Sequence, residues 1–378
     1  MMWEILFLLL PLAAFSGWMV GKRYFSRRSI EQILSTNHTL FNRRPEKNAQ
    51  QFVEWLEANQ ETVDTHLTLG NIFRRRGEVG KAIGIHQNLI AKSALTEDQR
   101  ALSLLELSRD YMRAGVLDRA EQVLLELVKE GRELEATLHH LIDIYQQSKD
   151  WLHAIEIARK LQETTKRNME PQIAHFYCEL AEQRWLKGER EMAFDHIKEA
   201  LKENPDCVRA SILLGNLETN AGHFKSAIKA YQQVEKQDPA FLSEIVFPIA
   251  RCFEALDMPD GMVKYFTHCL EKTSTLSAVL AFSDWLNKTK GEAEATKFVA
   301  EHLRVHPSVH GLSRLVQYSL ARAEGGTKAD LGILQELIDK LVANKPLYRC
   351  EACGFAGRTL QWQCPGCKRW DVIKPIHE

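Results

Sequence analysis

Turn-forming residues and net charge are both scarce in this chain of 378 residues. It has 11 prolines and 20 glycines, and its formal net charge is -1. A chain poor in proline and glycine favours long helices over many short strands joined by tight turns. A net charge near zero lacks the overall positive field on which non-specific nucleic-acid binders depend. We therefore expect a mainly helical protein with no nucleic-acid partner.

The sequence signatures of common enzymes are also missing. The chain contains no His-Glu-x-x-His zinc motif, no Gly-x-Ser-x-Gly nucleophile elbow and no dinucleotide-binding glycine fingerprint. No pair of acidic residues stands out as a general acid and base, and by pattern most of the 14 histidines fall on exposed helical faces. These absences predict a protein that is not an enzyme.

Residues 1–20, MMWEILFLLLPLAAFSGWMV, form a long apolar run whose single charge is Glu4. About 20 helical residues cover the roughly 30 Å hydrocarbon core of a bilayer. A secretory signal would need positive residues before the run and a small-x-small cleavage site after it, and neither is present. The run therefore predicts a single transmembrane helix over residues 1–20.

A block of positive charge follows this run within residues 21–28. Its members are Lys22, Arg23, Arg27 and Arg28. Because positive flanks of a membrane span stay on the cytoplasmic side, the block places the bulk of the chain in the cytoplasm and Met1 on the outer side. The same four residues flank the membrane and can contact anionic headgroups.

A repeat of about 34 residues fills residues 29–344. Small residues recur at Ala82, Ala120, Ala154, Ala193, Ala227 and Ala295, with Met262 in the corresponding place between the last two. The successive separations are 38, 34, 39, 34, 35 and 33 residues. Such a period, with small residues where two helices cross, resembles the tetratricopeptide repeat. We expect an all-α superhelical solenoid of about eight to nine copies, of which the first (29–60) and the last (310–344) are degenerate.

The clearest copy indicates how two helices cross. Gly215 is expected where the first helix meets its partner, Ala227 where the partner crosses back, Tyr231 on the apolar stripe and Pro239 at the end. A small residue at a crossing lets two helix backbones approach each other closely. Leu69, Gly70, Phe73 and Ala82 repeat this arrangement nearer the N-terminus.

The concave face of such an array usually binds extended segments or helices of partner proteins. Candidate hydrogen-bond donors to a partner backbone or carboxylate are Asn71, Arg74, Arg75, Asn216 and Asn220. The alternative is that each is an ordinary solvated polar residue. Chaperone-type tetratricopeptide domains clamp a C-terminal carboxylate with a lysine early in the first helix. Leu67 and Ile212 stand at the equivalent places, so that ligand is not predicted here.

Residues 345–378 contain two Cys-x-x-Cys pairs separated by ten residues. Their members are Cys350, Cys353, Cys364 and Cys367. Four thiolates on two tight turns can surround one metal ion tetrahedrally, and the spacing suits either zinc or iron. A pair of redox dithiols and structural disulfides are the alternatives, but two Cys-x-x-Cys pairs at short separation in a cytoplasmic chain favour a metal site. The scattered cysteines (Cys178, Cys207, Cys252 and Cys269) are expected to be small buried hydrophobes.

Glycines and aromatic residues complete the expected metal module. Gly354 and Gly366 are expected to relieve backbone strain beside the cysteines, so that amide groups point at the sulfurs. Tyr348, Phe355, Trp362 and Trp370 are expected to cap a module that has no core of its own. Since a domain below roughly 40 residues generally needs a staple, metal binding and folding should be linked.

Two functions from other classes can be built on this module. A rubredoxin-like electron carrier would use an iron site, but the ten-residue gap is much shorter than in rubredoxin and no second redox centre accompanies it. An RNA-binding zinc-ribbon protein would use the mild basic excess of residues 345–378, which carry six basic and three acidic residues. A visible absorption spectrum would identify the first, and salt-dependent RNA binding the second.

The order of all these parts resembles one family across essentially the whole length. An N-terminal anchor, a basic juxtamembrane block, tetratricopeptide repeats and a terminal module with YRCEACGF and WQCPGC resemble the lipopolysaccharide assembly protein B family of Gram-negative bacteria. The resemblance implies an inner-membrane protein that controls lipopolysaccharide levels. It implies that the protein promotes degradation of the lipid A pathway deacetylase (UDP-3-O-acyl-N-acetylglucosamine deacetylase) by the membrane-anchored protease FtsH. The family's four metal ligands correspond to the four clustered cysteines.

The hypothesis from the sequence is therefore a membrane-bound adaptor that concentrates a substrate beside a protease without chemistry of its own. Its expected partners are FtsH, the deacetylase and other lipopolysaccharide assembly or regulatory membrane proteins. The pattern leaves open the choice of zinc or iron, the repeats that meet each partner, homo-oligomerisation and gating by a lipid or a second membrane protein.

Overall fold

The computed structural model describes residues 62–92, 95–273, 276–343 and 345–376. The predicted anchor (1–20), the basic block (21–28) and the first predicted repeat copy (29–60) lie outside these residues. Among the described helices, none is long and apolar enough to cross a membrane. The chain divides into two compact units, 1–137 and 138–378.

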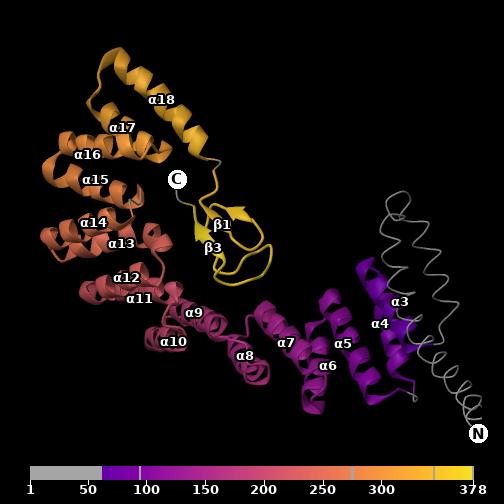
Figure 1. The fold of residues 1–378 in the computed structure, drawn as a ribbon. Helices are drawn as coiled ribbons and strands as arrows, with labels where there is room; N and C mark the ends of the chain where they lie inside the picture. The colour runs from indigo at the N-terminus through magenta and orange to yellow at the C-terminus, as the bar shows by residue number, and fades with distance from the viewer. Residues whose placement is uncertain (1–61, 93–94, 274–275, 344, 377–378) are drawn as a thin grey trace, which may run out of the picture. The chain divides into compact units, whose positions relative to one another are not determined.

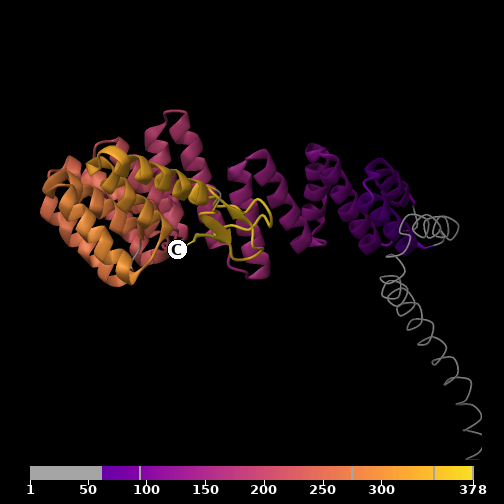
Figure 2. The same cartoon turned by 90° about the horizontal axis from the view of Figure 1, so that it is seen from above.

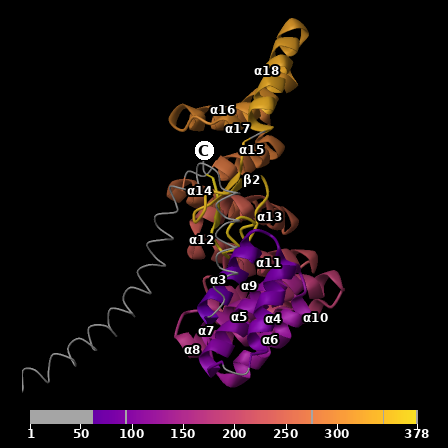
Figure 3. The same cartoon turned by 90° about the vertical axis from the view of Figure 1, so that its right-hand side faces the viewer.

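The first unit contains two antiparallel helix pairs and the start of α7, and Figure 3 looks onto its helices. Its complete helices are α3 (Val63–Arg75), α4 (Val79–Ile90), α5 (Glu97–Ala114) and α6 (Leu117–Glu130). Local signals fix their ends. Thr96 and Gln99 form a reciprocal capping box at the start of α5, and Gly115 ends that helix with a positive φ of 75°.

The second unit continues the pairing, with helices that follow one another in chain order along a curved row (Figures 1 and 2). Its helices are α7 (Leu134–Ser148), α8 (Trp151–Thr165), α9 (Glu170–Leu186), α10 (Arg190–Glu203), α11 (Val208–Asn220), α12 (Phe224–Gln237), the 3₁₀ turn η1 (Pro239–Phe241), α13 (Leu242–Ala255), α14 (Pro259–Thr273), α15 (Leu276–Lys290), α16 (Glu292–Val305), α17 (Val309–Arg322) and α18 (Gly325–Ala343). The prediction of an all-α tetratricopeptide solenoid is confirmed for the described residues between 62 and 343.

The repeating small residues lie where the helices cross. Ala82, Ala120, Ala154, Ala193, Ala227 and Ala295 each have an exposed fraction of 0%, and Met262 has 1%. Each of the seven stands in the second helix of a pair. The unequal separations of 38 and 39 residues leave the packing position unchanged, because the extra residues lie in the helices or turns between crossings.

The two crossing glycines have a clear steric reason. A Cβ atom built on Gly215 would lie 2.3 Å from Cε1 of Tyr231, and one on Gly70 would lie 2.4 Å from Nε2 of His86. Both distances are far below van der Waals contact, so no larger side chain fits without movement. The predicted roles of Gly215, Ala227 and Tyr231 are therefore confirmed.

Most of the described histidines are partly or fully exposed, but three are buried: His66, His86 and His175. His86 is fully buried and His175 is 3% exposed. Each occupies a core position because a specific neighbour accepts it: Asp110 for His86 and the ring of Trp370 for His175. A pattern of polar and apolar letters cannot reveal such partners.

The C-terminal module is a small antiparallel sheet that belongs to the second unit. Its strands are β1 (Tyr348–Cys350), β2 (Ala356–Gly357) and β3 (Ile373–Pro375), in the spatial order β2-β1-β3. Arg349 pairs with Ala356 on one side and with Lys374 on the other. The module lies on the inner side of the curved helical row, as Figures 1 and 2 show.

Candidate metal centre and its docking surface

The two cysteine pairs form two turns with matching backbone hydrogen bonds. The amide of Cys350 donates to the carbonyl of Phe355 (2.7 Å), and the amide of Cys364 donates to the carbonyl of Arg369 (2.8 Å). In each turn the residue four positions after the first cysteine, Gly354 or Lys368, donates back to that cysteine's carbonyl. The same local geometry is thus made twice, which brings two sulfurs to each side of one point.

Lys368 corrects one expectation about the glycines. In the first turn the positive φ falls on Gly354 (77°), as predicted, but in the second it falls on Lys368 (60°) and not on Gly366. A Cβ on Gly366 would lie 3.4 Å from Sγ of Cys353, which is ordinary van der Waals contact, so nothing in the structure explains a glycine at this position.

The sulfur positions fit a tetrahedral metal ion. The ligand atoms of Cys350, Cys353, Cys364 and Cys367 all lie within 4.8 Å of one another. Two of the S–S distances are 3.8 Å (Cys350 to Cys367) and 3.6 Å (Cys353 to Cys364). A tetrahedral zinc with sulfurs at about 2.3 Å has S–S edges of about 3.8 Å. The chain therefore contains a four-cysteine site of the zinc-ribbon or rubredoxin kind, where the four thiolates would hold one ion and tie the two turns together.

Protons would compete with a metal ion for the four cysteine sulfurs. Desolvation raises the pKa of the Cys364 thiol, but hydrogen bonds from the amides of Cys367 and Gly366, aided by the neighbouring thiols, bring it down to about 7. The amide of Phe355 lowers the pKa of Cys353, yet desolvation and the surrounding thiols raise it to about 11. Four sulfurs this close cannot all ionise by themselves, whereas a divalent or trivalent cation would stabilise every thiolate.

Trp370 docks the module onto helices α8 and α9. Its ring meets Trp151 (centroids 6.3 Å apart) and Phe176 (5.8 Å) edge to face and stacks on His175 (5.1 Å). Its indole N–H donates to Oε1 of Gln146 at 2.8 Å, and the same oxygen accepts from the Gln363 side chain at 3.0 Å. Aromatic pairs in these geometries contribute beyond their buried area.

A second set of contacts attaches the module near η1 and α13. Trp362 stacks on Phe241 with centroids 5.4 Å apart. The Lys374 ammonium lies 4.8 Å from the Phe241 ring centre and 2.8 Å from a carboxylate oxygen of Asp238. The Tyr348 hydroxyl donates to Glu244 at 2.9 Å. The module thus packs against helices that lie 104 to 224 residues away along the chain.

These contacts correct the expected role of the aromatic residues. Trp362 and Trp370 pack on the helices and do not cap the module, and Phe355 is 36% exposed. The interior of the module is made instead by Cys350, Cys364 and Ile373, with Tyr348 and Leu360 beside them. The module is too small to shield two tryptophans, so these rings find their apolar partners on the solenoid.

His175 is neutral at this interface. Burial, together with the positive charges of Arg209 and Lys374, lowers the pKa of His175 to about 3. Its exposed fraction is 3%, and its ring stacks on Trp370. An uncharged imidazole can therefore pack as an aromatic ring between α9 and the module.

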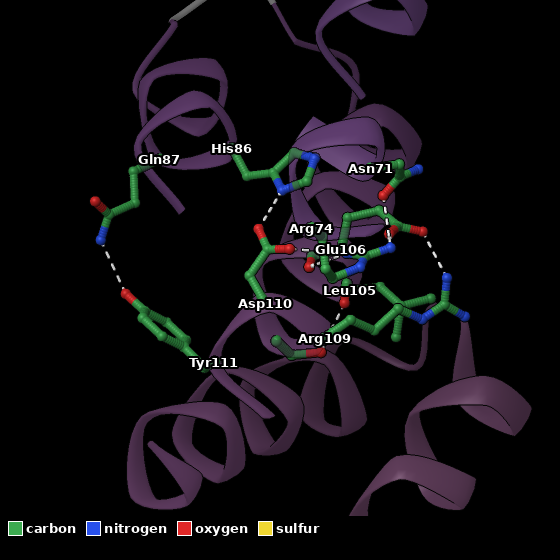
Figure 4. Close-up of polar contacts among 10 residues, drawn as sticks. Asn71, Arg74, His86, Gln87, Leu105, Glu106, Arg109, Asp110 and Tyr111 are labelled. Carbon is green, nitrogen blue, oxygen red and sulfur yellow. Dashed lines mark hydrogen bonds and ion pairs between the residues drawn. The ribbon is translucent and has the colours of Figure 1, made fainter. Parts of the chain in front are cut away.

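Two of the proposed partner-binding residues are engaged within the first unit, as Figure 4 shows. Arg74 donates to Asp110 at 2.9 Å, to Glu106 at 2.6 Å and to the amide oxygen of Asn71 at 2.6 Å. Asp110 is fully buried, and its other carboxylate oxygen is hydrogen-bonded to Nδ1 of His86 at 2.5 Å. This network uses the Arg74 guanidinium to balance buried carboxylates, while Arg75 is exposed at the end of α3.

The other two candidates lie on α11 in the second unit. Asn216 and Asn220 are both exposed, and Asn216 accepts a hydrogen bond from the Tyr231 hydroxyl at 2.7 Å. The structure brings neither of them to the four-cysteine site.

Several interface residues escaped the sequence analysis. Gln146, Trp151, His175 and Arg209 are spread over four helices, and none belongs to a local motif. Arg209 offers the only visible signal, because an arginine stands among the apolar residues at the start of α11. The four scattered cysteines, in contrast, are all buried as predicted.

Two family models match parts of this chain, and two relatives match it over almost its full length. Residues 348–375 match the family model of the rubredoxin metal binding domain, and residues 65–101 match that of the tetratricopeptide repeat. Lipopolysaccharide assembly protein B of Escherichia coli K12 is 35% identical over 384 residues, covering 99% of this chain and 98% of that protein. The protein of the same name from Haemophilus influenzae is 32% identical over 393 residues, covering 99% and 98%. A solved structure titled "Crystal structure of MamA protein" is 23% identical, covers 46% of this chain and 92% of its own, and has a TM-score of 0.32, a likeness too weak to carry an argument.

Proposed function

Because the chain belongs to the lipopolysaccharide assembly protein B family, we propose that it is an inner-membrane adaptor that controls lipopolysaccharide synthesis through proteolysis. In this proposal the tetratricopeptide solenoid binds protein partners and carries out no reaction. The partners are the membrane-anchored protease FtsH and the lipid A pathway deacetylase, together with other lipopolysaccharide assembly proteins of the membrane.

The division of labour follows the parts of the chain. Residues 1–20 anchor the protein, the basic residues of 21–28 hold the flank on the cytoplasmic side, residues 29–344 bind partners, and residues 345–378 bind zinc or iron through their four cysteines. Arg75, Asn216 and Asn220 are the exposed members of the proposed partner-binding set. Holding adaptor, protease and substrate at one membrane raises their effective concentration without a new chemical step.

The observation that supports this proposal best is the docking of the metal module onto the inner side of the helical row. The module contacts α8, α9, η1 and α13 through Trp370, Trp362 and Lys374. A metal ion that stabilises the module would thereby stabilise the surface that partners meet. The ion has a structural role in this scheme, and electron transfer is not required.

The test measures deacetylase turnover in cells. Replacing Cys364 and Cys367 by serine should slow deacetylase degradation, because the module loses two of its four sulfurs and unfolds. A Cys269→Ala variant, which removes a buried sulfur outside the metal site and keeps the position apolar, is the control and should leave turnover at the wild-type rate. An unchanged deacetylase half-life in the double variant, with its metal lost, would refute the structural role of the ion.

The membrane proposal has a separate test. A chain without residues 1–28 should lose the effect on the deacetylase, and fusion of residues 29–378 to an unrelated single membrane span should restore it. Full activity of the untethered chain would refute the concentration mechanism. Crosslinking in native membranes with the three versions identifies which partners depend on the anchor.

A further inference from the structure

A pocket of about 410 Å³ lies between the docked module and the helices of the second unit. Its polar walls are formed by Gln146, Glu179 and Arg209 on the helices, by Lys149 in the turn after α7, and by Gln361 and Lys368 on the module. Its apolar walls include the rings of Trp151, Trp362 and Trp370. We call this site the junction pocket.

Positive charge dominates the junction pocket. Lys149, Arg209 and Lys368 line it together with a single carboxylate, Glu179. Lys149 and Lys368 are both exposed, and the first lies after α7 while the second lies in the second metal turn. Low-dielectric walls of three indole rings strengthen the field of these charges toward an anion in the pocket.

Arg209 supplies the second, independent observation. Its side chain is 3% exposed, and its Nη2 contacts Glu179 at 2.8 Å and Glu182 at 3.0 Å. Its Nε and Nη1 atoms, and the indole Nε1 of Trp151, are buried and have no hydrogen-bond partner among the described residues. A buried charged donor without an acceptor is costly, so Arg209, a residue of the pocket wall, keeps hydrogen-bonding capacity that Glu179 and Glu182 leave unused.

We propose that the junction pocket binds an acidic segment of a partner protein, with an Asp or Glu carboxylate between Lys149 and Lys368 and near Arg209. A singly charged carboxylate suits the site better than a doubly charged phosphate because Glu179 and Glu182 lie beside Arg209. The amide side chains of Gln146 and Gln361 can form hydrogen bonds with the backbone of a peptide, and the indole rings can pack against the methylene groups of its side chains. This inference rests on the proposed adaptor function and specifies where and how a partner would be held.

The binding test uses the full chain in detergent with its metal bound. The probe is a fluorescein-labelled, acetylated and amidated hexaglutamate peptide, and hexaglutamine is the uncharged comparison. Hexaglutamate should bind, hexaglutamine should not, and raising the salt from about 0.05 M to about 0.5 M should weaken binding because it screens the lysine charges. Inorganic phosphate that competes better than acetate would overturn the assignment of a carboxylate.

Charge reversal locates the binding on the molecule. The double variant K149E and K368E should weaken hexaglutamate binding by about tenfold or more and should bind hexalysine in its place. Both lysines have a positive φ, and glutamate tolerates that backbone no worse than lysine, so the fold should hold. The matched control is K160E and K229E, which reverses two exposed lysines on α8 and α12 outside the pocket. Circular dichroism and metal content verify that both variants are folded.

The result that overturns the proposal is equal affinity in the pocket variant and its control, or no hexaglutamate binding by the wild-type chain. Crosslinking in native membranes separates this inference from the adaptor function. If the pocket variant loses hexaglutamate but still captures the protease and the deacetylase, the junction pocket is not the partner site and the adaptor role stands. If the wild-type chain captures neither protein, the proposed function itself fails.

Discussion

Replacing Trp370 by alanine should release the metal module from the helices while leaving its four-cysteine site intact. The indole ring of Trp370 contacts Trp151, Phe176 and His175, and its N–H bonds to Gln146. None of these partners belongs to the metal turns. The side chain therefore connects the module to the solenoid without holding the cysteines in place.

The magnitude follows from the kind of contact that is lost. Truncating a fully buried tryptophan to alanine costs about 3–5 kcal/mol of stability. A single hydrogen bond accounts for about 1 kcal/mol. Because Trp370 is partly exposed, we expect a loss of about 2–4 kcal/mol in docking free energy. About 3 kcal/mol corresponds to a shift of roughly 150-fold in the docking equilibrium. A Trp370→Phe variant keeps ring contacts and loses the N–H bond, so it should cost less.

Hydrogen–deuterium exchange is the assay. In the alanine variant, amides of α8, α9 and the module strands should exchange faster than in the wild-type chain, while metal content stays at one ion per chain. The control is Trp185→Ala, which removes a tryptophan of α9 that packs among the neighbouring helices and under Arg190. That variant should leave exchange in the module strands unchanged.

The reasoning is refuted if Trp370→Ala leaves exchange in the strands and in α8 at wild-type rates. Loss of the metal in this variant would also refute it, because the contacts of Trp370 would then be needed for the cysteine site itself. A faster exchange confined to residues 368–372 would mean that the remaining contacts of Trp362, Tyr348 and Lys374 suffice for docking.

Three further predictions test the solenoid, the interface and the metal. Gly215→Ala should lower the free energy of unfolding by about 1–3 kcal/mol because the new Cβ would lie 2.3 Å from the Tyr231 ring. Gly332→Ala on α18 has nothing within 4 Å of its Cβ and should raise that free energy by about 0.5–1 kcal/mol. Guanidinium unfolding followed by circular dichroism compares the two variants, and equal midpoints would contradict the steric argument. The pKa of His175 is about 3 in the folded chain and near 6.5 in the unfolded chain, so the free energy of unfolding is unaffected by this group above pH 6.5 and falls as the pH drops toward 3. The loss is about 2 kcal/mol at pH 5. His175→Phe should flatten this part of the curve of stability against pH, whereas His153→Phe, a change at an exposed histidine, should not. Removing the metal with a chelator should melt the strands of residues 345–376 and leave most of the helical signal, and a chelated chain with an unchanged near-ultraviolet tryptophan spectrum would show that the module folds without an ion.

Features that depend on neighbours along the chain could be read from the sequence. The two Cys-x-x-Cys pairs each form one turn, and a turn of this length fixes its own hydrogen bonds, as the matching contacts of Cys350 and Cys364 show. The repeat register was equally accessible, because Ala82, Ala227 and the intervening small residues recur at nearly constant spacing and pack against the adjacent helix. In both cases a short stretch of chain contains all the atoms that set the geometry.

The tertiary structure alone decided what lies next to what over long separations. Trp370 and Gln146 are 224 residues apart, and no pattern in either segment predicts their hydrogen bond. Three other features likewise depend on helices that meet in space. They are the ion pairs of Arg74 with Asp110 and Glu106, the burial of His175, and the Arg209 nitrogens that have no partner among the described residues. A single sequence encodes local turns and helix faces, but the balance of a buried charge is settled only when distant surfaces come together and exclude water.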